Sequence, residues 1–103
     1  MRILTINKIP DQQYEVLGLV KGSVVQSKHV GRDIMASLKQ IVVGEIKGYT
    51  EMLNEARETA TQRMLAEARN LGANAIIGAR FSTSNIMQNA AEVLAYGTAV
   101  KIV

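Results

Sequence analysis

The sequence predicts one α+β domain over residues 1–103, with elements in the order β-β-α-α-β-β. We expect an antiparallel sheet packed by one long amphipathic helix and one short helix. Two observations support this: apolar residues repeat with a helical period only in the middle of the chain, and strand-like runs flank that region on both sides. The chain has 103 residues, and domains commonly have about 100–150. We therefore expect no second domain.

The N-terminal quarter predicts two strands. Residues 2–5 indicate a short strand, and Pro10-Asp11 is typical of a turn, so that a hairpin could follow. Residues 14–27 are rich in Val and Leu and predict a long strand. Gly22 lies inside this run, and we expect the strand to bend or bulge there.

The middle of the chain predicts two helices. Residues 33–44 carry apolar side chains at helical spacing, which favours a short helix that ends at Gly44. Residues 44–48 are expected to be a loop. Residues 49–71 show the strongest amphipathic pattern in the chain, and Gly72 supplies a stop signal for this long helix.

After Gly72 the apolar period changes to two, which predicts strands over 74–82 and 92–103 joined by a polar loop over 83–90. On the first strand we expect one face to carry Ala75, Ile77, Ala79 and Phe81. On the last strand, a single charge in ten residues makes both faces apolar: Val93, Ala95, Gly97, Ala99 and Lys101 on one, Leu94, Tyr96, Thr98, Val100 and Ile102 on the other.

If both faces of the sheet are apolar, each face needs other residues that shield it from water. The helices can cover one face, and no other part of a chain this short is expected to cover the second. An open face would expose several hundred Å² of apolar surface at about 25 cal/mol per Å², which monomers usually avoid. We therefore predict self-association through the sheet. The alternative is that a bulge at one of the glycines changes which side chains lie on each face of a strand, so that one face of the sheet is polar and exposed to water.

The composition excludes several classes of protein. Hydrophobic residues make up 48% and charged residues 20%, as in soluble globular proteins, and there is no Cys for disulfides or thiolate metal sites. Twelve Lys and Arg against nine Asp and Glu give a net charge of +3 without a basic run, so we expect no nucleic-acid partner. No segment reaches the ~18–20 apolar residues of a membrane span, and residues 1–11 do not resemble a signal peptide. We expect a cytoplasmic protein with no membrane partner.

The candidate metal ligands are His29, the only histidine, and Asp33, which follows it by one helical turn. Two ligands do not make a zinc site, so His29 is otherwise a surface loop residue. Copies of the chain around a symmetry axis would multiply each ligand. That is the route to a divalent metal site that the sequence leaves open.

The remaining motifs are explained by structure without a functional role. Three carboxylates, Glu51, Glu55 and Glu58, share one side of the long helix and are explained by a solvated face. The hydroxyl cluster at 82–85 has no neighbouring base in the sequence. The glycines flanking the 44–48 loop match no phosphate-binding spacing. We expect no enzyme activity and no catalytic residue.

Three blocks of sequence carry a family resemblance: GYTEMLNEAR (48–57), LGANAIIGARFSTS (71–84) and AYGTAVKIV (95–103). They resemble the YbjQ-like family of small bacterial and archaeal proteins described as "putative heavy-metal-binding". The match is nearly end to end, so residues 1–103 are expected to form one YbjQ-like domain. The resemblance implies a dodecin-like fold and a ring-shaped homo-oligomer, commonly a pentamer.

The chain also departs from the family pattern. It has Gly44-Glu45 where the family has Gly-Gly-Arg, and it has Arg80, Ser82 and Thr83 where many members carry acidic residues, so a metal site built on those carboxylates is missing. The resemblance supplies no catalytic residue.

From the residues and the resemblance together we expect a non-enzymatic homo-oligomer with a shared site at a subunit junction or axis. Metal is the first ligand class to consider for this site. The alternative is an apolar pocket between subunits for a small molecule or cofactor, with Tyr96 and Phe81 as walls.

Overall fold

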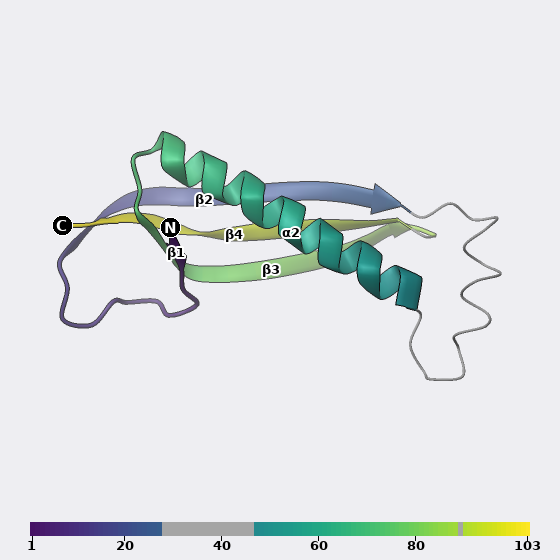
Figure 1. Ribbon diagram of the computed structural model, residues 1–103, viewed down its shortest axis with the longest axis horizontal. Helices are drawn as coiled ribbons and strands as arrows, with labels where there is room; N and C mark the ends of the chain where they lie inside the picture. Colours follow the sequence, from purple (N-terminus) through teal and green to yellow (C-terminus); the bar gives the residue numbers. More distant parts are fainter. Residues whose placement is uncertain (28–46, 89) are drawn as a thin grey trace.

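The structure is a computed structural model that describes residues 1–27, 47–88 and 90–103. These residues form one helix and one four-stranded sheet, which confirms the α+β class (Figure 1). The elements are β1 (Arg2–Ile3), β2 (Tyr14–Ser27), α2 (Lys47–Asn70), β3 (Ala75–Met87) and β4 (Ala90–Ile102). The expected short helix over 33–44 and most of the expected 44–48 loop lie outside the described residues.

The strand order is β1-β3-β4-β2, and the sheet is mixed rather than antiparallel throughout. β4 runs antiparallel to both β2 and β3, whereas β1 runs parallel to β3. The expected hairpin between the first two strands is wrong, because they lie at opposite edges of the sheet. The residues that follow β1 stay hydrogen-bonded to β3. The Leu4 amide donates to the Ile76 carbonyl at 2.8 Å, and the Ala79 amide donates to the Leu4 carbonyl at 3.0 Å.

Helix α2 forms where the amphipathic pattern predicts it, and it begins two residues earlier, at Lys47. It packs mainly on β2 and β4 and crosses the sheet obliquely (Figure 1). Its buried face consists of Met52, Ala56, Ala60, Met64, Leu65 and Ala68. The predicted stop at Gly72 is confirmed: with φ at +83° its amide donates to the Arg69 carbonyl at 2.9 Å, and the Ala73 amide donates to the Ala68 carbonyl at 3.1 Å. These two bonds satisfy carbonyls at the helix end.

At Gly22 the backbones of β2 and α2 lie in close contact. A Cβ atom added here would collide with the carbonyl oxygen of Ala60 and the amide nitrogen of Met64, and would lie 2.8 Å from the Arg63 Cβ. Backbone atoms cannot move aside as the end of a flexible side chain can, so the contact requires a residue without a side chain. The bend expected at Gly22 is wrong, since the register shift in β2 lies immediately before Gly18.

A second register shift, in β3, changes which side chains share a face. It lies between Ile77 and Arg80 and contains Gly78, whose φ of +62° is a conformation that L side chains rarely adopt. The extra residue reverses the alternation, so Phe81 lies opposite Ala95 on the helix side while Ile77 lies on the other side. The expectation that Ile77 and Phe81 share a face is therefore wrong.

The last two strands are longer than predicted at the turn that joins them. β3 continues to Met87 and β4 begins at Ala90, so the expected loop over 83–90 is mostly strand. We call this end of the sheet, where β2 also ends at Ser27, the distal end. The two chain termini lie at the opposite end (Figure 1).

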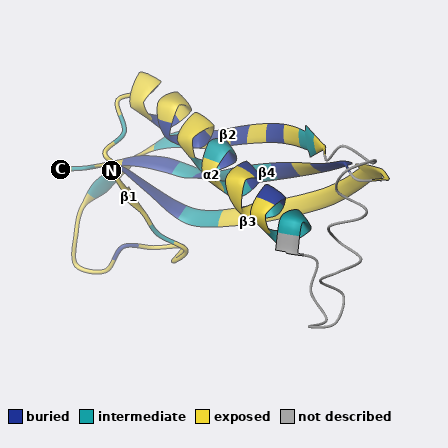
Figure 2. Cartoon of the chain, turned by 45° about the vertical axis from the view of Figure 1, so that its right-hand side comes forward, coloured by how far each residue is buried: buried dark blue, intermediate teal, exposed yellow. Residues whose placement is uncertain are grey.

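The helix-free face of the sheet is covered in part by the N-terminal segment. Ile9 is buried and packs in a cluster with Ala75, Ile77 and Val100. The expectation that no other part of the chain covers this face is therefore wrong near the termini. Figure 2 shows buried residues along β4, whereas the distal half of β3 is exposed throughout.

We predict that Gly22→Ala lowers the free energy of unfolding by about 1–3 kcal/mol, because the added methyl group overpacks a contact made by backbone atoms. Urea unfolding followed by circular dichroism measures the change. Ser23→Ala is the matched control. Ser23 is the residue next to Gly22, and its side chain is exposed and faces away from α2. An unchanged urea midpoint for Gly22→Ala would contradict the close packing.

Candidate functional site

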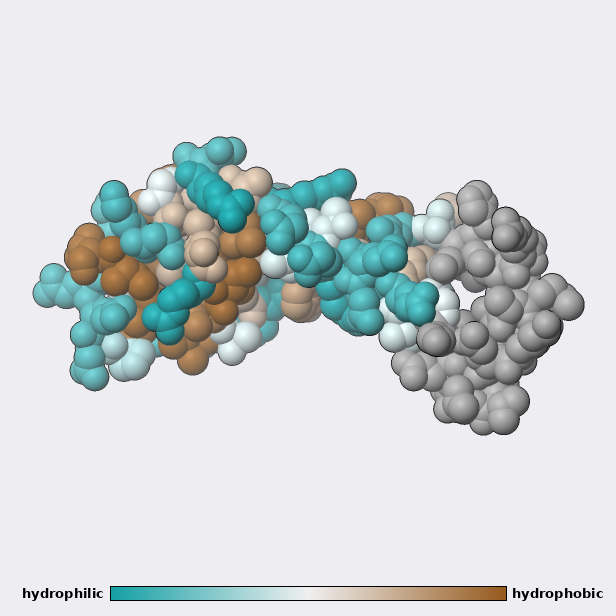
Figure 3. Space-filling view, viewed as in Figure 1, coloured by the Kyte–Doolittle hydropathy of each residue, from teal (hydrophilic) through white to brown (hydrophobic). Residues whose placement is uncertain are grey.

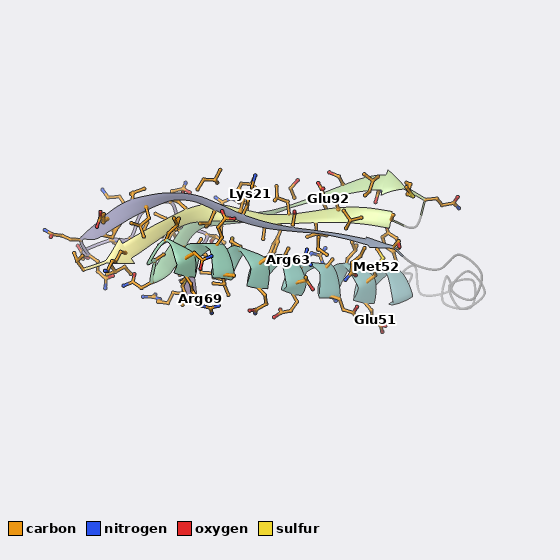
Figure 4. The ribbon with its side chains drawn as sticks, turned by 90° about the horizontal axis from the view of Figure 1, so that it is seen from above. Lys21, Glu51, Met52, Arg63, Arg69 and Glu92 are labelled. Atoms are coloured by element: carbon orange, nitrogen blue, oxygen red, sulfur yellow. The ribbon has the colours of Figure 1, made fainter. Side chains whose placement is uncertain are left out.

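The candidate site is the helix-free face of the sheet beyond the cover that Ile9 provides. The register of the ladders places nine side chains there in three rows across β2, β4 and β3. We call these residues the distal face: Lys21, Tyr96 and Arg80; Ser23, Leu94 and Ser82; Val25, Glu92 and Ser84. Figure 4 shows Lys21 and Glu92 on the side of the sheet away from α2.

Within the distal face, a half-buried tyrosine lies between two cationic residues. Tyr96 is level with Lys21 on one side and Arg80 on the other. The Arg80 Nη1 donates to the Thr5 carbonyl at 2.8 Å and to the Ala79 carbonyl at 2.8 Å, so the N-terminal segment fixes the guanidinium. This row offers an aromatic ring beside two positive charges.

Glu92 is the single carboxylate of the distal face. It is exposed and lies level with Val25 and Ser84. One carboxylate beside a hydroxyl is an incomplete cation site, because structural metals take about four or more protein ligands. With Lys21 and Arg80 the distal face carries a net charge of +1 per copy.

The sequence-predicted ligands are not brought together in the described structure. His29 and Asp33 lie outside the described residues. Glu51, Glu55 and Glu58 are all exposed on α2, which confirms the solvated face, and Figure 4 shows Glu51 pointing away from the sheet. Within residues 1–27, 47–88 and 90–103, no three His, Asp or Glu side chains are grouped so that they could hold a metal ion.

The other sequence motifs do not form a site in one copy of the chain. Residues 82–85 lie on β3, where successive side chains point to opposite faces, and the Asn85 Oδ1 accepts a hydrogen bond from the Tyr49 hydroxyl at 3.1 Å. Phe81 and Tyr96 lie on opposite faces of the sheet, so they cannot be two walls of one pocket within a single copy. Gly48 lies inside α2 rather than in a loop.

The apolar period of the strands did not predict the grouping of Lys21, Tyr96 and Arg80, because the extra residue at Gly78 is what places Arg80 on the same face as Tyr96. The signal was the glycine in the middle of an apolar strand, which is typical of a bulge.

The surface on the helix side of the sheet carries both hydrophobic and hydrophilic side chains. Figure 3 shows hydrophobic side chains gathered toward the end that holds the two termini, while the outer side of α2 is hydrophilic. In the part of the chain that the structure describes, no helix has both the length and the apolar character needed to cross a membrane.

A family model described as "Putative heavy-metal-binding", that of the YbjQ-like proteins, matches residues 1–103. The chain belongs to the YbjQ-like family. It is 68% identical over 102 residues to a UPF0145 protein from Helicobacter hepaticus, covering 99% of this chain and 98% of the relative. It is also 58% identical over 103 residues to a UPF0145 protein from Thermotoga maritima, covering 99% and 97%.

A solved structure supports the fold of this YbjQ-like chain. It is the crystal structure of a protein of unknown function in the DUF74 family from Pediococcus pentosaceus, with a TM-score of 0.67 and 19% identity, covering 100% of this chain and 98% of the other. At this identity the similarity concerns the α+β architecture alone.

Proposed function

We propose that this YbjQ-like protein is a non-enzymatic, homo-oligomeric binding or structural protein with a site shared between copies. The observation that supports assembly most directly is the distal half of β3. All eight residues from Arg80 to Met87 are exposed, although two paired strands without a further neighbour are only marginally stable in water. In one described copy, β4 is the only strand that pairs with this segment.

Exposed apolar side chains support the same proposal. Around the distal end, Val25 is 57% exposed, Phe81 54%, Ile86 52% and Met87 70%. Burying apolar surface contributes about 25 cal/mol per Å². A second copy covering these side chains would therefore be stabilised by the same effect that holds the core of one copy together.

We predict that the purified protein has a mass of several subunits by light scattering at micromolar concentration. The resemblance to ring-shaped homo-oligomers makes a pentamer the first stoichiometry to check. A single-subunit mass of about 11.2 kDa would overturn the proposed assembly and the shared site with it.

Metal is the first ligand class to test, because the family description names it. The described residues of one copy offer Glu92 on the distal face and no cluster of three metal ligands, and the sequence adds His29 and Asp33, so the proposed coordination sphere takes ligands from several copies. Neutral imidazole suits zinc and copper, whereas carboxylate suits harder cations. The positive charges of Lys21 and Arg80 oppose a cation at the distal face, so a heavy metal is better served by copies of His29 than by copies of Glu92.

We predict that dialysed protein binds zinc or copper in calorimetry, with less than one ion per chain, and that His29→Ala abolishes this binding. Glu55→Gln is the control, because it removes an exposed carboxylate from α2 without touching the distal face. Elemental analysis of the purified protein provides an independent readout. Absence of bound metal in both measurements would overturn the metal proposal.

The second candidate is a small organic ligand held between copies, supported by the half-buried Tyr96 and Leu94 beside two cationic residues. An anionic compound with an aromatic or apolar body fits this chemistry better than a metal does. Native mass spectrometry of the purified assembly should then show a co-purified compound that is lost in Tyr96→Ala. Glu51→Gln is the control, because Glu51 is exposed on α2 and points away from the sheet. An assembly mass equal to that of the bare chains would contradict this alternative.

A further inference from the structure

The outer edge of β2, on the side away from β4, has no described strand beside it but is partly occupied by side chains of α2. The Lys21 amide donates to the Glu67 Oε1 at 3.3 Å. The Arg63 Nη1 donates to the Ser23 carbonyl oxygen at 2.6 Å. Lys21 and Ser23 are two residues apart in an antiparallel ladder, so their backbone groups point to the same side. Two helix side chains therefore take the positions that a neighbouring strand would take.

Close backbone packing at Gly22 holds these two side chains at the edge. Gly22 lies between the two bonded residues of β2 and contacts backbone atoms of α2. Arg63 and Glu67 are four residues apart, so they are neighbours on one side of the helix. Figure 4 shows Arg63 on the sheet side of α2, whereas Arg69 lies on its outer side. The two hydrogen bonds are thus made by a helix whose position is also fixed by the backbone contact.

The other features of the β2 edge differ along the strand. Toward the chain termini, a register shift immediately before Gly18 interrupts the ladder, and Lys21 carries a positive charge. Bulges and lysines are two devices by which natural edge strands avoid further pairing. Residues 24–27 contain no charge, no proline and no register shift. The two contacts with α2 thus complete a protected stretch of β2 that ends at Ser23.

A charged side chain also ends the protected part of the opposite edge. Among the described residues, Ala79 is the last of β3 whose amide bonds to the N-terminal segment. The Arg80 Nη1 donates to the carbonyls of both Ala79 and Thr5. Arg80 is level with Lys21 in the register of the sheet. Charged side chains therefore cap backbone groups on both edges at nearly the same level.

We infer that Arg63 and Glu67 form an edge guard, two charged side chains that keep residues 21–23 of β2 closed to the addition of any further strand. An added strand would need the Lys21 amide and the Ser23 carbonyl, and would displace a carboxylate and a guanidinium from them. Hydrogen bonds to charged groups are roughly twice as strong as neutral ones, so this exchange is unfavourable. The guard does not depend on the proposed self-association, because all four groups belong to one chain.

Hydrogen exchange of the Lys21 amide tests the guard, first in the unaltered protein. This amide should exchange slowly, although no described strand covers it. Glu67→Ala should accelerate its exchange about tenfold, as expected for the loss of one hydrogen bond to a charged group. Exchange of the Lys21 amide in the unaltered protein at the rate of an unstructured peptide would overturn the guard. So would an unchanged rate in Glu67→Ala.

Two controls separate loss of the guard from general loosening of the fold. The Gly22 amide is the internal control, because it points toward β4 and is paired in the ladder. Acceleration of both amides would show that Glu67→Ala loosens β2 as a whole, and would overturn the specific contact. Glu58→Ala is the matched variant, since Glu58 is also exposed on α2 and accepts one hydrogen bond at 3.3 Å, from the Gln62 Nε2. It should leave the exchange of the Lys21 amide unchanged.

Strand addition itself tests the blocking role. Arg63→Ala/Glu67→Ala should raise thioflavin T fluorescence severalfold on incubation, since residues 21–27 then present one uninterrupted edge. Glu58→Ala/Arg69→Ala makes the same changes of charge on the outer side of α2 and should match the unaltered protein. Arg63→Lys/Glu67→Gln keeps one donor and one acceptor and should also match it.

Unchanged fluorescence in Arg63→Ala/Glu67→Ala, with the circular dichroism of the unaltered protein and faster exchange of the Lys21 amide, would overturn the blocking role. Equal fluorescence in Arg63→Lys/Glu67→Gln and Arg63→Ala/Glu67→Ala would show that the hydrogen bonds do not close the edge, and would overturn it as well. If the double alanine variant fails to fold, the exchange rates of the unaltered protein and of Glu67→Ala decide whether the guard exists.

Discussion

The architecture depends on β4, the central strand whose backbone is paired along almost its whole length on both sides. Because β2 and β3 both pair with it, they are held parallel to each other and at a fixed level. Small side chains on its helix side, Ala95 and Ala99 with Gly97 between them, are buried and leave room for α2. The same ladder extends the sheet to strands of 13–14 residues, or about 45 Å at ~3.3 Å per residue.

α2, the helix of the described residues, cannot cover a sheet of that length alone. The 24 residues of α2 span about 36 Å at 1.5 Å per residue, and the helix crosses the strands obliquely instead of following them. It leaves the distal half of β3 uncovered on the helix side, while Ile9 covers only the terminal end of the other face. Among the described residues, the exposed distal end thus follows from the lengths of the elements and needs no unusual local chemistry.

Sequence patterns predicted the elements in which side-chain burial and backbone structure agree. The bounds 14–27 are confirmed for β2, and the Gly72 stop is confirmed for α2, because each rests on a local signal. Sequence patterns failed to predict strand structure where only backbone hydrogen bonds between strands keep the chain extended. Residues 83–87 are polar or exposed, so period and burial gave no strand signal, yet pairing with β4 keeps them extended.

Non-local contacts account for the other differences. Nothing in residues 2–5 indicates that this short strand pairs in parallel with a segment more than 70 residues later. The bulge at Gly78 was visible as a glycine, but its effect on the faces of β3 depends on the register with β4. The register accordingly places Phe81 opposite Ala95 on the helix side and Arg80 beside Tyr96 on the helix-free face.

Under the proposed assembly, the distal face would become a binding site only between copies of the chain. A single copy presents one carboxylate, one tyrosine and two cations on an open surface, where water screens each charge and no ligand is enclosed. In the proposed assembly, several copies would each contribute two or three groups to one shared site and would exclude solvent from it. The proposal makes the family description compatible with the absence of a metal-ligand cluster among the described residues of one copy, since the same residue supplied by each copy would replace the several different residues that a site within one chain needs.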